Sequence, residues 1–454
     1  MSKARQRPKE QCETERRSNF DTVEFNLTPE QAKCEAQRCL RCKNPQCSKG
    51  CPVQVDIPAF ISALADDDVK TAGEVIRKTN MLPSVCGRVC PQERQCEGRC
   101  VLGIKSEPIA IGALERYVGD SSEPERNEIK DNGKKVAIVG SGCAGMSAAA
   151  DLRAAGFDVT IFEALHEFGG VLRYGIPPFR LPREVLDREI NSLKDIGVKF
   201  VKNVIVGKSI TLKQLKEEGF EAIFICSGAG LPKMLGIKGE NLNGVYSANE
   251  FLTRVNLMHA HRADSPTPLK IGKKAAIIGG GNVAMDAART AVRVGYKEVY
   301  IVYRRTEEEL PARLEEIRHA KEEGIIFKLL HSPVEIFGEN QVEGMKLEIM
   351  ELGEPDESGR RRPVPTGKYT EMDVDTVIVA LGTDPNPIIQ QSAQKDNMEI
   401  DTDKWSYIVI NDKGETSLEG IYAGGDVAPL GESTAINAMG AGKRAAKSII
   451  EQLS

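Results

Sequence analysis

The sequence predicts an α/β protein in which a small helical unit precedes two doubly wound, nucleotide-binding units. The pattern of buried strand, glycine turn, helix and strand occurs twice, with roughly 140 residues between the two copies. Ten of the twelve cysteines lie within the first 100 residues, well before either copy. The chain therefore combines an internal duplication with a separate cysteine-rich segment.

Length and charge restrict the classes of function. With 454 residues, 41% of them hydrophobic, the chain is long enough for roughly three domains. Its formal net charge of -5 gives no general attraction for nucleic acid or for an anionic membrane. No apolar run of about 20 residues occurs, and the charged N-terminus lacks the apolar stretch of a signal peptide. We therefore expect a cytoplasmic protein with no nucleic-acid partner and no membrane insertion.

We expect residues 1–133 to form the helical unit. The stretch TPEQAKCEAQRCL begins a helix, because Thr28 suits the N-cap, Pro29 the first turn and Gln31 the reciprocal capping position. The polar segment 119–135 has the composition of a linker, and the character of the chain changes to α/β after it. In a reducing cytosol, clustered cysteines favour metal binding or redox chemistry over disulfides.

The first nucleotide-binding unit begins with KVAIVGSGCAGMSAAADLRAAGFDVTIFE. Gly140, Gly142 and Gly145 form G-x-G-x-x-G, a turn that lets backbone N–H groups at a helix N-terminus approach a pyrophosphate. Glu163 ends the second strand, where a carboxylate accepts hydrogen bonds from ribose hydroxyls. Glycines also serve plain strand-to-helix turns, but the acid and the strand–helix–strand context favour a Rossmann-like dinucleotide site.

The second unit contains KKAAIIGGGNVAMDAARTAVRVGYKEVYIVYRR, in which Gly279, Gly281 and Ala284 form G-x-G-x-x-A. Its second strand ends in Arg304 and Arg305, where the first unit has an acid. A guanidinium pairs with the 2′-phosphate of NADP, which a carboxylate would repel. Unless these arginines merely occupy a solvated strand end, the second unit prefers NADPH to NADH.

Two fingerprints with different residues after the second strand indicate two dinucleotides, FAD in the first unit and NADP(H) in the second. The segment GIYAGGDV resembles the second flavin-contacting segment of two-dinucleotide flavoproteins, in which an acid, here Asp426 after Gly425, bonds the ribityl chain. A discontinuous FAD-binding domain is therefore expected around an inserted NADP(H)-binding domain. The expected ranges are 134–250 and 376–454 for the FAD-binding domain and 251–375 for the NADP(H)-binding domain.

The clustered cysteines form two runs, C-x2-C-x4-C-x3-C-P at 39–52 and C-x3-C-x5-C-x3-C at 86–100. Zinc sites usually pair two C-x2-C or C-x4-C knuckles, and only the first pair here complies. Closely spaced thiols with a final cysteine before proline are typical of ferredoxins. A flavin also links the two-electron hydride of NADPH to one-electron clusters, whereas zinc accepts no electrons. Two [4Fe–4S] clusters are therefore the favoured interpretation, with zinc or unligated thiols as alternatives.

Five stretches of the sequence resemble those of a known family: RCLRCKNPQCSKGCPV, LPSVCGRVCPQERQCEG, GGVLRYGIPPFRLP, GGGNVAMD and VYRRTEEELPAR. With them, nearly the whole chain resembles the glutamate synthase small-subunit family. That family includes the large subunit of the electron-bifurcating NADH-dependent ferredoxin:NADP oxidoreductase and the N-terminal half of dihydropyrimidine dehydrogenase. Glutamate synthase small subunits more often have Asp-Thr where this chain has Asn282 and Val283, so the chain looks more similar to the bifurcating large subunit.

The resemblance implies that the cluster ligands interleave. The expected sets are Cys39, Cys42, Cys47 and Cys100 for one cluster, and Cys51, Cys90, Cys96 and Glu115 for the other. In this family the eighth ligand is a Gln or Glu on a following helix, and Glu115 in IGALERYV matches that position. The plain alternative makes Cys86 the eighth ligand and Glu115 a surface acid.

Cys143 stands where the family generally has proline. A helix N-terminus there could lower its thiol pKa, but we expect Cys143 to be a packing residue.

The sequence thus predicts an FAD and iron–sulfur oxidoreductase subunit that exchanges electrons between NADP(H) and a partner. The cofactors carry the redox chemistry, so we expect no catalytic side chain. The favoured activity is that of the large subunit of a bifurcating ferredoxin:NADP transhydrogenase, with a ferredoxin and a second flavoprotein subunit with an NAD site as partners. The alternatives are a glutamate synthase small subunit that supplies a glutamate-forming large subunit, and an electron-relay subunit that does not itself oxidise NADPH.

Overall fold

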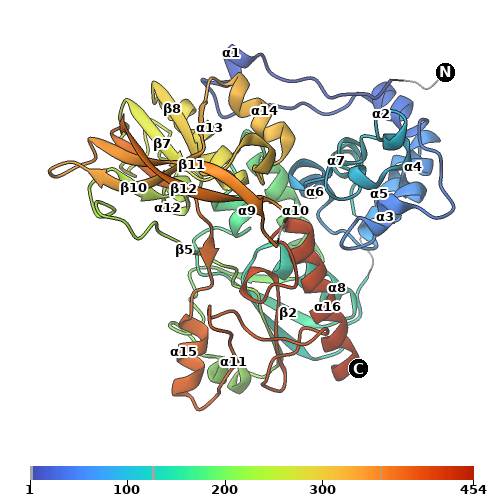
Figure 1. Ribbon diagram of the computed structural model, residues 1–454. Coiled ribbons are helices and arrows are strands. Elements are labelled where there is room, and N and C mark those ends of the chain that lie inside the picture. The colour runs from blue at the N-terminus through green and yellow to red at the C-terminus, as the bar shows by residue number, and fades with distance from the viewer. Residues whose placement is uncertain (1–3, 125–127, 358) are drawn as a thin grey trace.

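The computed structural model describes residues 4–124, 128–357 and 359–454, and it contains a helical unit and two sheet-containing units (Figure 1). The helical unit lies beside the helices of the first sheet unit, and the second sheet unit lies above the first in the view of Figure 1. Within the described residues, no helix has the length and apolar composition needed to span a membrane.

The helical unit is built from short helices. They are α2 (Pro29–Ala36), α3 (Gln46–Lys49), α4 (Ile57–Ala65), α5 (Val69–Arg77), α6 (Pro83–Val89) and α7 (Ile111–Ser121). The short helix α1 (Glu13–Arg16) precedes them and lies against the second sheet unit (Figure 1). The predicted capping box is confirmed, since the Gln31 N–H donates to the Thr28 hydroxyl at 3.2 Å and the Thr28 N–H donates to the Gln31 side chain at 3.0 Å. Helix α7 extends into the polar segment predicted as a linker, of which residues 125–127 lie outside the described residues.

The first sheet is parallel, with the strand order β15–β4–β1–β2–β3. Its strands are β1 (Lys135–Val139), β2 (Asp158–Phe162), β3 (Lys199–Val201), β4 (Phe220–Ile225) and β15 (Ile421–Ala423). Helix α8 (Cys143–Ala154) follows β1, and the C-terminal helix α16 (Ala435–Leu453) packs on it. A Cβ at Gly442 would lie 2.2 Å from the Ala144 carbonyl oxygen, so small residues allow these two helices their close approach.

The second sheet is also parallel, with the order β6–β13–β7–β8–β9. Its strands are β6 (Val245–Ser247), β7 (Lys274–Ile278), β8 (Glu298–Tyr303), β9 (Ile326–Leu329) and β13 (Thr376–Val379), and its helices include α12 (Ala248–Leu252), α13 (Asn282–Val294) and α14 (Leu314–Glu322). Strand β13 pairs with β7 on one side and β6 on the other. The sheet therefore takes in strands on both sides of the expected range 251–375.

Two further sheets complete the second unit and its connections. Strands β10 (His331–Phe337), β11 (Gly344–Pro355) and β12 (Arg361–Asp373) form an antiparallel sheet. Strands β5 (Leu231–Pro232) and β14 (Thr383–Asp384) lie on the two chain crossings between the parallel sheets and pair antiparallel. The two crossings thus form one short ribbon between the units.

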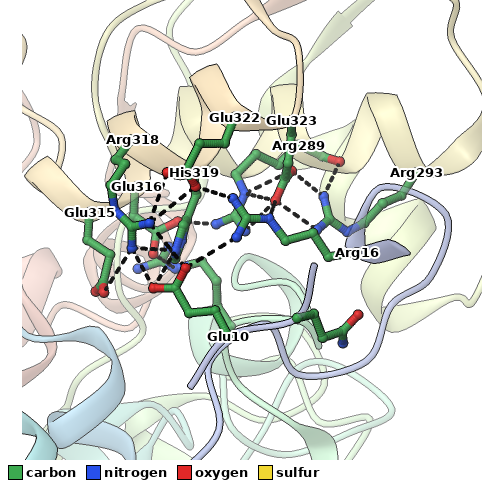
Figure 2. Close-up of polar contacts among 12 residues, drawn as sticks. Glu10, Arg16, Arg289, Arg293, Glu315, Glu316, Arg318, His319, Glu322 and Glu323 are labelled. Carbon is green, nitrogen blue, oxygen red and sulfur yellow. Dashed lines mark hydrogen bonds and ion pairs between the residues drawn. The ribbon is translucent and has the colours of Figure 1, made fainter. Parts of the chain in front are cut away.

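A buried ionic network joins the N-terminal arm, residues 4–28, to the second unit. The arm runs from the helical unit to α14 and back (Figure 1). Arg16 pairs with Glu322 at 2.5 Å and with Glu323 at 3.2 Å, and Arg289 on α13 also pairs with Glu323 (Figure 2). Charges this deeply buried are tolerated because each has a close partner of opposite sign. The arm is therefore fixed to α13 and α14 by charge as well as by packing.

Candidate functional site

The first glycine turn leaves an open space before the N-terminus of α8. Gly140 has φ +116°, and a Cβ there would lie 2.6 Å from the Cys226 carbonyl oxygen. Gly142 is the N-cap of α8, no side chain caps the helix, and a Cβ at Gly142 would meet no described atom within 4 Å. At Gly145 a Cβ would lie 2.1 Å from the Gly140 carbonyl oxygen. The turn is closed toward the sheet and open toward solvent, which fits a pyrophosphate on free helix N–H groups.

Glu163 braces this turn directly. Its Oε2 accepts hydrogen bonds from the backbone N–H of Ser141 at 3.1 Å and from the Ser141 hydroxyl at 2.5 Å, while Oε1 accepts from the Leu165 N–H at 2.9 Å. The Ser141 hydroxyl in turn accepts from the Gly169 N–H at 2.9 Å. The glycine fingerprint does not single out Ser141, because this residue occupies a variable position inside G-x-G-x-x-G.

The segment containing Asp426 lies against the same helix end. Gly425 has φ +72°, and a Cβ there would lie 3.2 Å from the Ala144 Cβ. Burial raises the pKa of the Asp426 carboxyl. Burial also raises the pKa of Tyr174 to about 12, and the charges of Asp426 and Glu163 contribute. The N-cap of α9 (Val171–Tyr174) lies against the glycine turn, since a Cβ at Gly170 would lie 3.1 Å from the Gly142 Cα, and this brings Tyr174 near the predicted flavin site. The sequence indicated this segment only through the motif GGVLRYGIPP.

The second glycine turn has the same construction. Gly279 has φ +146°, and a Cβ there would lie 2.5 Å from the Ala380 carbonyl oxygen. Gly281 is the N-cap of α13 without a side-chain cap, and Ala284 is fully buried in the first turn. Asn282 begins the helix, and its Oδ1 accepts a hydrogen bond from the Arg313 N–H at 2.9 Å. This helix end also suits a pyrophosphate.

The two arginines after β8 have different environments. Arg304 is exposed at the end of the strand. Arg305 is buried; its Nη2 pairs with the Asp356 carboxylate at 2.5 Å, and its Nε donates to the Arg361 carbonyl oxygen at 2.7 Å. Arg305 therefore fastens the end of the β11–β12 hairpin to β8, and Arg304 is the arginine whose side chain stays available to a ligand.

The first set of predicted cluster ligands is brought together. Cys39, Cys42, Cys47 and Cys100 line one cavity whose other walls are almost entirely aliphatic. Burial raises the pKa of Cys47 to about 11, and the nearby Cys100 and Cys39 add to the effect. Four thiols around one apolar cavity are a donor set that suits a [4Fe–4S] cluster.

The second set also converges. Burial raises the pKa of Cys51 to about 11, with contributions from the charges of Glu115 and Cys90. Burial likewise raises the pKa of Cys96, assisted by Glu97, Glu115 and Cys90. Cys90 and Cys96 are buried, so this set lies deeper in the protein than the first. The charges of Glu115 and Cys90 act on both Cys51 and Cys96, so these four residues lie in one neighbourhood, and their ligation of a cluster stays a prediction.

Cys86 lies in the same neighbourhood. A hydrogen bond with Cys90 and burial raise its pKa well above the usual range. The Cys86 sulfur is 3.6 Å from Asn80 Oδ1 and 3.6 Å from the sulfur of Met439 on α16. Glu115 is buried, so the alternative that made it a surface acid is wrong on that point.

Cys143 connects the second cysteine set with the first glycine turn. Burial raises its pKa to about 12, and the charges of Asp426 and Cys90 contribute. Burial therefore outweighs any lowering by the N-terminus of α8, and the buried position agrees with the packing role expected of Cys143. Cys143 and Cys90 lie in one buried hydrophobic cluster, which connects the second cysteine set with the first glycine turn.

Two family models match adjacent parts of the chain. Residues 16–127 match "Dihydropyrimidine dehydrogenase domain II, 4Fe-4S cluster", and residues 134–442 match "Pyridine nucleotide-disulphide oxidoreductase". The first match confirms the iron–sulfur interpretation of the cysteine runs over zinc. The second confirms the fold class and the dinucleotide chemistry expected of the two parallel sheets.

Relatives match along nearly the whole chain. The small chain of NADPH glutamate synthase from Halomonas elongata is 35% identical over 99% of this chain and 96% of its own, and the Escherichia coli protein is 36% identical over 96% and 95%. The beta subunit of the NADP(+)-dependent formate dehydrogenase of Moorella thermoacetica is 38% identical, over 90% of this chain but 60% of its own length.

Solved structures share the fold of the two sheet units. Mycobacterium tuberculosis FprA in complex with NADPH has a TM-score of 0.58 and 24% identity, covering 70% of this chain and 84% of FprA. The thioredoxin reductase of T. acidophilum has a TM-score of 0.53 and 22% identity, covering 71% of this chain and all of the reductase. These likenesses support the architecture alone.

Proposed function

This chain belongs to the iron–sulfur flavoprotein family of the NADPH glutamate synthase small chain, and we propose that it exchanges electrons between NADP(H) and a separate redox partner. It is an NADP(H)-dependent oxidoreductase that uses FAD and [4Fe–4S] clusters. FAD supplies the chemistry that connects a two-electron hydride with one-electron clusters. The side chains bind and orient the cofactors.

We assign the cofactor contacts as follows. FAD is held by Gly140, Gly142, Gly145, Glu163, Gly425 and Asp426, and NADP(H) by Gly279, Gly281, Asn282, Ala284, Arg304 and, through the hairpin it fastens, Arg305. One cluster is ligated by Cys39, Cys42, Cys47 and Cys100, and the other by Cys51, Cys90, Cys96 and Glu115. The open helix N-termini and the converging thiols support these assignments.

One contact region carries the proposal. The Met439 sulfur of α16 lies 3.6 Å from the Cys86 sulfur, and Cys90, Cys143 and Met439 belong to one buried hydrophobic cluster. The deeper cysteine set and the first glycine turn thus share one core, which supports electron transfer between the predicted flavin site and that set. The first cysteine set lies nearer the surface, so the two sets form a route from the flavin outward.

The finer proposal is that the chain is the large subunit of an electron-bifurcating ferredoxin:NADP transhydrogenase. Its partners would be a ferredoxin and a second flavoprotein subunit with an NAD site. Asn282 and Val283 at the start of α13 favour this choice, because glutamate synthase small subunits more often have Asp-Thr there. The Asn282 side chain accepts a hydrogen bond from the Arg313 N–H, so this position contacts the segment after β8.

A second candidate is the glutamate synthase small subunit, which would deliver electrons to a glutamate-forming large subunit. Relatives of that name are 35% and 36% identical over nearly their full lengths, which favours it. Anaerobic affinity purification from the native host distinguishes the transhydrogenase subunit from the glutamate synthase subunit. A large amidotransferase-type chain in the complex supports glutamate synthase, and a smaller NAD-binding flavoprotein supports the transhydrogenase.

The activity itself is tested by NADPH-dependent reduction of a dye of higher potential than NADPH, such as dichlorophenolindophenol, by the purified holoprotein. The proposal predicts reduction with NADPH at lower concentrations than with NADH. Absence of dye reduction by either nucleotide, with full FAD and iron content, would identify an electron-relay subunit and overturn the proposal.

A further inference from the structure

We propose that Arg313 and Gln92 link the NADP(H) site to the deeper cysteine set, so that a bound nucleotide lowers the potential of the cluster predicted there. The inference rests on the proposed function, because it connects two of the cofactor sites that this function requires. Both residues act through other groups, so they are positioning residues. Arg313 belongs to residues 310–314, which we call the linking segment.

The linking segment lies against the second glycine turn. The Arg313 N–H donates to Asn282 Oδ1 at 2.9 Å, and the Ala312 N–H donates to the Gly280 carbonyl oxygen at 3.2 Å. Asn282 is the first residue of α13, the helix whose free N–H groups we assign to the pyrophosphate. A single residue therefore separates the predicted nucleotide from Arg313.

The linking segment is also hydrogen-bonded to the helical unit. The Arg313 guanidinium donates to the Arg88 carbonyl oxygen at 2.7 Å and to Gln92 Oε1 at 2.9 Å. Arg94 donates to two carbonyl oxygens of the segment, at 3.2 and 3.3 Å. These contacts lie on both sides of Cys90, which is the C-cap of α6. The nucleotide loop is thus fastened to the stretch of chain that carries a predicted cluster ligand.

Gln92 extends this contact to the surroundings of the deeper cysteine set. Its side-chain Nε2 donates to the Cys86 carbonyl oxygen at 3.2 Å, and its backbone N–H donates to the Cys90 carbonyl oxygen at 3.0 Å. A Cβ at Gly112 would lie 2.5 Å from Gln92 Nε2, so Gln92 also packs on α7, the helix that carries Glu115. A movement of the Gln92 amide would therefore move peptide dipoles beside the predicted ligands.

Burial makes these contacts effective. Arg313 is 8% exposed and Gln92 3% exposed, and charges and dipoles act more strongly where water is excluded. Cluster potentials depend on the hydrogen bonds and charges around the cluster. The phosphates of a bound nucleotide attract the Arg313 guanidinium and so draw positive charge away from Gln92. This change disfavours the negative charge that an added electron brings, and the potential of the cluster falls.

The link has a consequence for the direction of electron flow. A lower potential makes the reduced cluster a stronger donor, so an electron leaves it more readily when a nucleotide occupies the NADP(H) site. Thermodynamic linkage requires the reverse effect as well, so that reduction of the cluster weakens nucleotide binding by the same factor.

A redox-silent nucleotide tests the link without turnover. The probe is 2′-phospho-ADP-ribose, which has the pyrophosphate and the 2′-phosphate of NADP but no nicotinamide ring, so it exchanges no electrons. Anaerobic redox titrations of the holoprotein, followed by EPR, give the midpoint potential of each cluster with and without a saturating concentration of the probe. The readout is the shift that the probe causes, so a change in the starting potential of a variant does not affect it.

Two variants and two controls locate the link. The variants are Arg313→Met and Gln92→Met, which remove the hydrogen bonds between the two side chains. The local control is Arg318→Met on α14, because Arg318 pairs with Glu10 and Glu322 and so fastens the same helix to the N-terminal arm. The distant control is Lys213→Met, exposed on α11 (Leu212–Glu217) in the lower part of Figure 1. Iron content and EPR spectra establish that each variant keeps its clusters.

In wild type we expect the probe to lower the midpoint of one cluster by the equivalent of a roughly fivefold difference in probe affinity, which is about 40 mV at about 59 mV per tenfold. Either variant should lose most of this shift, and both controls should retain it. An unchanged midpoint in wild type, or the full shift in Arg313→Met and Gln92→Met, would overturn the link. NADPH-dependent dye reduction is measured in parallel, and its absence in wild type would overturn the proposed function itself.

Discussion

The side-chain amide of Asn80 donates a 2.6 Å hydrogen bond to the carboxylate of Glu115. The oxygen of the same amide accepts from the Leu82 N–H at 2.9 Å and lies 3.6 Å from the Cys86 sulfur. Asn80 is fully buried, so it holds the Glu115 carboxylate in one orientation among the thiols of the deeper cysteine set. The two candidates for the eighth cluster ligand, Glu115 and Cys86, therefore lie on either side of one amide.

Substitution at Glu115 should change one cluster and leave the other unchanged. Replacing a charged carboxylate with a neutral amide, in Glu115→Gln, should raise the potential of the deeper cluster by tens of millivolts, an order-of-magnitude expectation, and alter its EPR signal. Cys86→Ser is the matched comparison and should retain iron, sulfide and both signals. Unchanged spectra in Glu115→Gln together with cluster loss in Cys86→Ser would assign the ligand to Cys86 instead.

Arg304 should decide the preference for NADPH. Because its side chain is exposed while Arg305 is paired with Asp356, we expect Arg304→Ala to raise the KM for NADPH roughly tenfold and to leave the KM for NADH nearly unchanged. Arg305→Ala should have the smaller effect on nucleotide preference and the larger effect on thermal stability. Steady-state rates of dye reduction at several concentrations of NADPH and of NADH give the two KM values. Equal loss with NADPH and NADH in Arg304→Ala would contradict a 2′-phosphate contact.

Ser141 should contribute to FAD retention through Glu163. Ser141→Ala removes a 2.5 Å hydrogen bond to the buried carboxylate, and a hydrogen bond to a charged group contributes about 1.5–3 kcal/mol. We therefore expect roughly tenfold weaker FAD binding, measured as the FAD-to-protein ratio after dialysis. Ser147→Ala is the control, since its buried hydroxyl on α8, the helix after this turn, has no hydrogen-bond partner within the described residues. Full FAD content in Ser141→Ala would refute the bracing role of this contact.

Stability in acid should depend on Glu323 of the buried network. Burial alone would raise its pKa, but the hydrogen bond from Arg293 and the charge of Arg289 lower it to about 2 from the usual 4.5 (Figure 2). A lowered carboxyl pKa stabilises the folded state fully above pH 4.5, and this contribution disappears as the pH falls from 4.5 toward 2. At pH 7 it amounts to about 3 kcal/mol.

Glu323→Gln should accordingly lower the urea midpoint at pH 7 and reduce the loss of stability between pH 5 and pH 3. Urea unfolding at several pH values, followed by the emergence of flavin and tryptophan fluorescence, measures both effects. Glu217→Gln, at an exposed position on α11, should match wild type. A Glu323→Gln protein with the wild-type pH profile would show that the network carries no acid-dependent stability.

Local patterns predicted the elements that bear the cofactors. The Thr28–Gln31 capping box, the two strand–turn–helix units and their glycines are all properties of short stretches, so the sequence alone indicates them. The open helix ends at Gly142 and Gly281 follow from the same stretches, because an uncapped N-terminus after glycine needs no distant residue.

Long-range pairs were not predictable in the same way. The contact between Arg305 and Asp356 joins residues about 50 positions apart, so the sequence could not distinguish Arg305 from the available Arg304. Tyr174 reaches the predicted flavin site only because α9 folds back over the glycine turn. The second sheet includes β6 and β13 because strand pairing, which depends on the whole fold, determines which strands belong to it.

An anaerobic NADPH titration tests the central claim most directly. The purified protein is analysed for iron, sulfide, zinc and flavin, and the titration is followed by visible absorption and EPR. Two clusters predict about eight iron and eight sulfide per FAD, with bleaching by NADPH more readily than by NADH and cluster EPR signals on reduction. Zinc in place of iron and sulfide, or clusters that stay oxidised while the flavin bleaches, would contradict a route from NADP(H) through the flavin to the N-terminal clusters.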